Sequence, residues 1–144
     1  MIGNCSNVAS YLNNLAGLLR DTNRLAEAEP MFRRALTITE ASLGSDHPDV
    51  AIRLNNLAGL LQASDRPDEA EQMYRRSALI LLRASQASGH WLPNTSVGVR
   101  NWAGALLVLG QTGEQVGAAI VALLTEAGLD PETVWDRIFG DADE

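Results

Sequence analysis

The sequence predicts an all-α solenoid, a stack of helix-turn-helix units, and three observations support this fold class. Residues 8–38 return as residues 50–80, an offset of 42, and 18 of the 31 aligned positions are identical. Within each copy, leucine and alanine recur at intervals of three and four residues, which is the spacing of one apolar helix face. Copies related by such a period are supersecondary units that bury their apolar faces against one another.

The first unit, about residues 8–49, contains two apolar stripes separated by a polar turn. The first stripe predicts one helix and consists of Leu12, Leu15, Ala16 and Leu19. Residues 20–24 interrupt the stripe with polar turn formers. The second stripe predicts a second helix and consists of Ala28, Met31, Phe32, Ala35, Leu36 and Ile38. Gly44 and Pro48 mark the loop that leads into the next unit.

Two further units follow. The second, about residues 50–92, repeats the pattern of the first, whereas the third, about residues 93–127, is degenerate. In the third unit, Gln115 stands where Ala28 and Ala70 stand in the other two. A slip of one residue restores an apolar stripe at Val116, Ile120, Leu123 and Leu124.

Residues 128–144 predict a short capping helix followed by an acidic tail. Asp130 is a favourable N-cap, and Pro131 suits the first helical position. The last unit of a solenoid needs a cover because it otherwise leaves an apolar face in water. The residues that we expect to fold back onto the third unit are Val134, Trp135, Ile138 and Phe139. Trp135 and Phe139 are expected to be the main cover.

The opposite end of the stack has no such cover in the sequence. Residues 1–7 align with the loop at residues 43–49, so we expect no helix in front of the first unit. Parts of Tyr11, Leu15 and Leu18 are therefore expected to face water. A contiguous exposed apolar patch commonly marks an interface, and two-fold pairing is the commonest symmetry, so we expect a homo-oligomer, in the simplest case a dimer.

One set of small and aromatic residues in the first unit resembles the signature of the tetratricopeptide repeat. The set consists of Ala16, Ala28, Phe32 and Ala35. The 42-residue period and the run Leu-Asn-Asn-Leu-Ala resemble the kinesin-light-chain subtype, which also occurs in bacterial multidomain proteins. The resemblance implies a right-handed superhelix of three repeats and a cap, a single domain over residues 1–144, whose first helices line a concave groove for protein partners.

Asparagines recur in the first helix of every unit. Asn is a mediocre residue inside a helix, so its return at the same place asks for a tertiary role. In the resembling family, matching asparagines contact bound peptides. The candidate groove residues are Asn13, Asn14, Asn55, Asn56 and Asn101, with Arg20, Gln62 and Arg100 as further donors. The alternative is that one asparagine of each pair satisfies the backbone of a neighbouring helix.

The second helices carry arginines, and the loop before the third unit carries a tryptophan. Glu29 and Glu71 lie four residues before Arg33 and Arg75, the favourable orientation for exposed ion pairs along a helix. We therefore expect a solvated outer face there. Trp91 is either an exposed contact residue or a plug over the second unit, and the sequence does not decide between these alternatives.

Composition excludes several classes of function. The net charge is −7, the opposite of what a nucleic-acid-binding face requires, and the basic residues are all arginines, so there is no Schiff-base or nucleotide-binding lysine. Cys5 with His47 and His90 forms neither a disulfide framework nor a recognisable metal or catalytic set, so we expect no cofactor. No apolar run approaches the ~18 residues of a membrane span, and the start lacks a secretory signal. We expect a cytoplasmic protein with no membrane partner.

The predicted function is therefore protein–protein interaction without catalysis. In this interpretation the chain binds an extended peptide or a partner helix in its concave groove. The alternative is structural: the chain is the homo-oligomerising end of a longer array of repeats.

Overall fold

The protein is an all-α stack. A computed structural model describes residues 2–140, and these residues form seven helices and no strand. The helices are α1 (Ile2–Asp21), α2 (Leu25–Leu43), α3 (Pro48–Ala63), α4 (Pro67–Ser88), α5 (Thr95–Val108), α6 (Gly113–Glu126) and α7 (Pro131–Phe139). The predicted fold class is confirmed.

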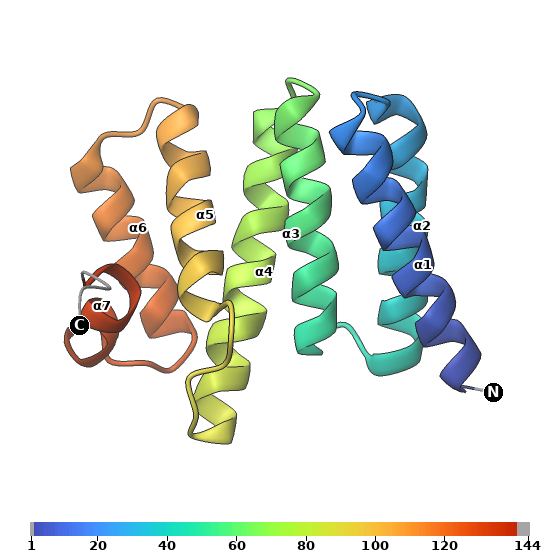
Figure 1. The fold of residues 1–144 in the computed structure, drawn as a ribbon. Helices are drawn as coiled ribbons and strands as arrows, with labels where there is room; N and C mark the ends of the chain where they lie inside the picture. The colour runs from blue at the N-terminus through green and yellow to red at the C-terminus, as the bar shows by residue number, and fades with distance from the viewer. Residues whose placement is uncertain (1, 141–144) are drawn as a thin grey trace.

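The helices form three consecutive hairpins and a final single helix. Figure 1 shows the hairpins α1–α2, α3–α4 and α5–α6 following one another across the molecule, with α7 at the C-terminal end. Between hairpins, α3 packs against α2, and α5 packs against α4. The apolar core is continuous from Ala16 in α1 to Ile138 in α7. We call the three hairpins repeats 1, 2 and 3.

Short-range side-chain capping marks the beginning of α3 and of α6. The Nδ1 atom of His47 accepts a hydrogen bond from the Asp49 amide at 3.1 Å, and Pro48 occupies the first turn of α3. At α6, Thr112 and Gln115 form a reciprocal capping box. Gln115 therefore caps the helix, and the core positions move on by one residue. The predicted slip is confirmed, since the buried side chains of α6 are Val116, Ile120, Leu123 and Leu124.

The start of α1 differs from the prediction. We expected residues 1–7 to be a loop, as in the equivalent segment 43–49, whereas α1 is helical from Ile2. In repeat 2 the proline at position 48 begins the helix, and the equivalent residue of repeat 1 is Ser6. Without the proline, nothing in the local sequence prevents the helix from extending towards the N-terminus.

Charged side chains on the second helices join repeat 1 to repeat 2. Arg66 donates to both carboxylate oxygens of Glu29, at 2.9 and 2.8 Å, and to Glu69 at 2.8 Å. Arg33 binds the same Glu29 at 2.9 Å, as the four-residue spacing predicts. Glu29 thus lies at the centre of a network that spans the two repeats.

The equivalent pair in repeat 2 was predicted wrongly. Arg75 donates to Glu126 of α6 at 2.6 Å instead of pairing with Glu71. Glu71 accepts a hydrogen bond from the indole Nε1 of Trp102 at 2.7 Å. The spacing within α4 is favourable for the predicted pair, but the third repeat supplies a competing acid for the arginine and a competing donor for Glu71.

Helix α7 closes the C-terminal end by packing on α5 and α6. Val134 and Ile138 are buried, whereas Trp135 and Phe139 are half-buried and lie 4.8 Å apart between ring centroids. The predicted cap is present, but its main anchors are the aliphatic residues. They point into the stack, and the two rings cover its margin. The predicted acidic tail, residues 141–144, lies outside the described residues.

Trp91 is not an exposed contact residue, and its hydrogen bond is to α5. Its ring is half-buried against the core, and its Nε1 donates to the Ser96 hydroxyl at 2.9 Å. That hydroxyl in turn donates to the backbone oxygen of Arg137 at 2.9 Å. The Arg137 guanidinium carbon lies 6.0 Å from the centre of the Trp91 ring. The loop before α5 is thereby tied to both α5 and α7.

The cap makes a first prediction. Ile138 is fully buried, so Ile138→Ala is expected to lower the free energy of unfolding by about 2–4 kcal/mol, through lost burial and the cavity left behind. Asp136→Ala, at an exposed position of the same helix, is the matched control. Chemical denaturation of the two variants measures the difference. Equal unfolding curves would show that α7 does not stabilise the stack.

The Glu29 network makes a second prediction. Burial raises the pKa of the Glu29 carboxyl, but hydrogen bonds from Arg66 and Arg33 outweigh it, so the pKa lies below its usual range. A lowered folded-state pKa contributes stability that is present above the unfolded-state pKa and is lost as pH falls through the folded-state pKa. Glu29→Gln is therefore expected to be less stable than the unaltered protein at pH 7. This difference should shrink in thermal melts as the pH falls below about 4.

Candidate binding surface

Asparagine side chains form hydrogen bonds between the first helices of successive repeats. The Asn56 amide of α3 donates to Asn13 of α1 at 3.1 Å, and the Asn101 amide of α5 donates to Asn55 of α3 at 2.9 Å. In both cases the second asparagine of one repeat binds the first asparagine of the preceding repeat. The amides therefore pair with one another, and not with the backbone of a neighbouring helix as the structural alternative proposed.

A first hollow lies between α1 and α3, and we call it the α1 hollow. It has a volume of about 400 Å³. Its lining residues are Asn13, Asn14, Gly17, Leu18, Arg20, Asp21, Phe32 and Asn56. A Cβ atom added at Gly17 would meet no atom within 4 Å. The glycine therefore faces open space and does not serve close packing between helices.

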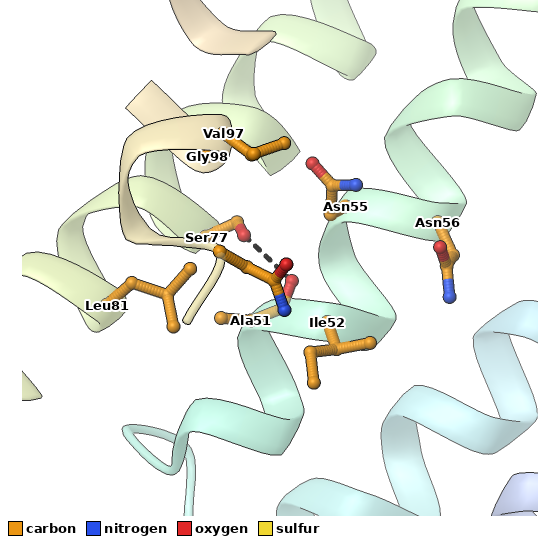
Figure 2. Close-up of a pocket in the computed structure, with 9 residues that line it drawn as sticks. Ala51, Ile52, Asn55, Asn56, Ser77, Leu81, Val97 and Gly98 are labelled. Carbon is orange, nitrogen blue, oxygen red and sulfur yellow. Dashed lines mark hydrogen bonds between the residues drawn. The ribbon is translucent and has the colours of Figure 1, made fainter. Parts of the chain in front are cut away.

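A second hollow lies where α3, α4 and the start of α5 meet, and we call it the α5 hollow. It has a volume of about 220 Å³ and no charged side chain in its lining (Figure 2). The lining residues are Ala51, Ile52, Asn55, Asn56, Ser77, Leu81, Asn94, Val97 and Gly98. The Ser77 hydroxyl donates to the Ala51 carbonyl at 2.7 Å, so these two polar groups of the lining already have a hydrogen-bond partner. Its free polar character comes from the asparagine amides.

The hollows bring together five of the eight predicted groove residues and leave out three. Those that line a hollow are Asn13, Asn14, Arg20, Asn55 and Asn56. Gln62 instead accepts a hydrogen bond from the Tyr74 hydroxyl at 3.4 Å, and Arg100 donates to the Ser96 carbonyl of its own helix at 3.4 Å. Asn101 is held by Asn55. Burial raises the pKa of the Tyr74 hydroxyl, and the positive charge of Arg20 partly opposes this rise.

Of the nine residues that line the α5 hollow, sequence reasoning predicted only Asn55 and Asn56, and three of the missed residues bear on ligand binding. Ile52 and Val97 form exposed apolar parts of its lining, with exposed fractions of 39% and 47%. Asn94 adds an amide from a left-handed backbone position, φ 68°. One signal was available in the sequence: Ile52 is apolar but lies outside the stripe of its helix, where repeat 1 has Ser10.

The front of α1 carries the exposed apolar side chains that the sequence predicts. Tyr11, Leu15 and Leu18 have exposed fractions of 71%, 45% and 66%, and Val8 adds a fourth at 41%. Whether another chain covers them stays a prediction. We call these four residues the front stripe.

Two other features of residues 2–140 bear on the kind of site. In this part of the chain, no three His, Cys, Asp or Glu side chains are grouped so that they could hold a metal ion. None of the described helices combines the length and the apolar character that crossing a membrane requires.

Comparison with known families agrees with the hairpin architecture. The family model of the tetratricopeptide repeat matches residues 7–81, about half of the chain. The chain belongs to the tetratricopeptide repeat family. A search of curated proteins finds no match. The matched segment covers repeat 1 and most of repeat 2, and tetratricopeptide repeats generally mediate protein–protein interactions. The degenerate third repeat lies beyond the matched residues.

The asparagine pairs make a third prediction. The double variant Asn56→Ala and Asn101→Ala removes both inter-repeat amide bonds, each worth about 1 kcal/mol, and gains part of this back from the better helix propensity of alanine. Asn14→Ala removes an exposed amide, so its unfolding free energy should be unchanged or higher. Denaturant titration of the two variants measures the contrast. If the double variant is as stable as Asn14→Ala, the amide pairs do not contribute to the stability of the joints between repeats.

Proposed function

We propose that this tetratricopeptide repeat protein is a non-catalytic interaction module that binds an extended peptide or a partner helix along its first helices. One observation carries the proposal: Asn56 lines both hollows, so the two form one track across α1, α3 and the start of α5. A track that spans two repeats suits an extended ligand better than a small molecule. The 42-residue period supports a place in the kinesin-light-chain-like subtype.

The chemistry of the track supports a peptide ligand. In the α5 hollow, Ile52 and Val97 offer apolar surface to one ligand side chain. Asn55 and Asn94 line the same hollow, and an amide side chain both donates to and accepts from a peptide backbone. In the α1 hollow, Arg20 donates to Asp21 at 3.2 Å, and both side chains line the hollow, so this end of the track is polar without a net charge. The proposed ligand therefore has an apolar anchor at one end and a polar part at the other.

A fourth prediction tests the track. Ile52→Glu and Val97→Glu place a carboxylate in an uncharged hollow, so each is expected to weaken binding of a track ligand at least tenfold. Both positions are exposed, so the thermal midpoint should change little. Peptides selected from a display library on the unaltered protein serve as ligands, and isothermal titration calorimetry measures their affinity.

Val121→Glu is the matched control for these variants. Val121 lies on α6, away from both hollows, and its exposed fraction of 43% is close to that of Ile52 and Val97. It receives the same change of charge and size. If all three variants bind the selected peptides equally well, the ligand does not occupy the α5 hollow.

A second candidate function is self-assembly, and the exposure of Tyr11, Leu15 and Leu18 favours it. In this case two chains cover the front of α1, and Leu15→Glu shifts the protein towards the monomer. Light scattering over a hundredfold concentration range separates the candidates. A constant mass near 15.5 kDa excludes self-assembly and leaves the track function untouched.

A further inference from the structure

The front stripe has buried counterparts in the other two repeats. Its residues are spaced three, four and three apart, so they lie on one face of α1. At the aligned positions of repeat 2, Val50, Leu57 and Leu60 are fully buried, and the counterpart of Tyr11 is the half-buried Arg53. At those of repeat 3, the buried residues are Thr95, Gly98, Trp102 and Ala105. In both repeats the first helix packs on the second helix of the preceding hairpin. The molecule itself therefore shows what kind of unit covers this face.

A hydrogen-bond donor accompanies the stripe. At both joints between repeats, an asparagine at the second position of the pair donates to the asparagine at the first position in the preceding repeat: Asn56 to Asn13, and Asn101 to Asn55. The aligned residue of repeat 1 is Asn14, and its side chain is exposed. Asn14 thus occupies the position from which, at each existing joint, an asparagine donates a hydrogen bond to the preceding repeat.

A second donor lies at the start of α2. At both joints a glutamate of the preceding second helix accepts a bond from the following repeat: Glu29 from Arg66, and Glu71 from Trp102. Arg24 is aligned with Arg66 and binds Glu27 at 2.8 Å, just as Arg66 binds Glu69 at 2.8 Å. Arg66 reaches back to Glu29 as well, whereas 58% of the Arg24 side chain is exposed.

We propose that the front of repeat 1 binds another helix-turn-helix repeat of the same 42-residue type, stacked in the register that joins repeat 1 to repeat 2. The partner repeat carries an amide acceptor at the position of Asn13 and a glutamate at the position of Glu29. The first accepts from Asn14 and the second from Arg24. The front stripe packs against the partner's second helix. The first nineteen residues hold no charged side chain, so burying this part of α1 does not require a charge to be removed from water. This surface shares Asn14 and Leu18 with the α1 hollow of the track, and none of its residues lines the α5 hollow.

The C-terminal repeat of a second copy does not fit this description. Arg100 stands at the position of Asn13 and Asn55, so a cation replaces the amide acceptor. With the one-residue slip of α6, Gly117 stands where Glu29 and Glu71 stand, so the carboxylate is missing as well. Helix α7 also packs on α5 and α6 at that end. The partner is therefore a repeat of the kind found at positions 1 and 2 of this stack.

The test extends the full chain by one repeat. Residues 1–49 are placed directly before Val8, which gives the front stripe a preceding repeat with the required asparagine and glutamate. We expect the thermal midpoint to rise by about 5 °C or more. We also expect amide hydrogen exchange in the original residues 8–21 to slow at least tenfold.

Leu15→Glu provides the decisive comparison. In the unextended chain Leu15 is exposed, so the variant should melt within about 1 °C of the unaltered protein. In the extended chain, the same change in the original repeat should abolish the gain in melting temperature. Leu57→Glu is the control, because Leu57 is buried at an existing joint and its loss should destabilise both chains.

Two results would overturn the proposal. The first is an extended chain in which Leu15→Glu leaves the melting temperature and the exchange of residues 8–21 unchanged, because the added repeat then does not dock on the front stripe. The second is an unextended chain that is a dimer by light scattering and that Leu15→Glu both dissociates and destabilises. In that case a second copy, and not a further repeat, occupies the surface. Neither result bears on the α5 hollow, whose lining contains no residue of the front stripe.

Discussion

The packing of each first helix against the second helix of the preceding repeat is the contact on which the rest of the molecule depends. Leu57 and Leu60 of α3 and Trp102 of α5 are buried at these joints, and burial of a side chain of this size contributes about 1.5–3 kcal/mol. The same joints set the distance between successive first helices. They therefore also determine where the hollows lie and which asparagines meet.

Apolar burial alone does not fix the register of the stack, because the hydrophobic effect has no direction. The directional interactions lie on either side of the apolar joint. On the first helices, one asparagine amide reaches back to the preceding repeat, and on the second helices Glu29 or Glu71 accepts a bond from the following one. A shift of one helical turn would break both sets, so they select a single alignment.

The stack presents two surfaces with different chemistry, which meet at Asn14 and Leu18. The track along the first helices combines hollows with amides and one uncharged apolar subsite, which suits an extended ligand that is held partly by its main chain. The front of repeat 1 is an apolar stripe accompanied by Asn14 and Arg24, which matches the joints inside the stack. The C-terminal end has no corresponding acceptors and is closed by α7, so the two ends of the stack differ.

The sequence by itself determined the helices, the period and the shifted core of α6, because helical periodicity and capping depend on residues within a few positions of one another. It also indicated which side chains of the front stripe face water. Only the tertiary structure decided that Arg75 binds Glu126, that Asn56 binds Asn13, and that Ile52 and Val97 share a hollow. These contacts join residues 43 to 51 positions apart. Whether they form depends on the distances between packed helices, which a one-dimensional pattern does not contain.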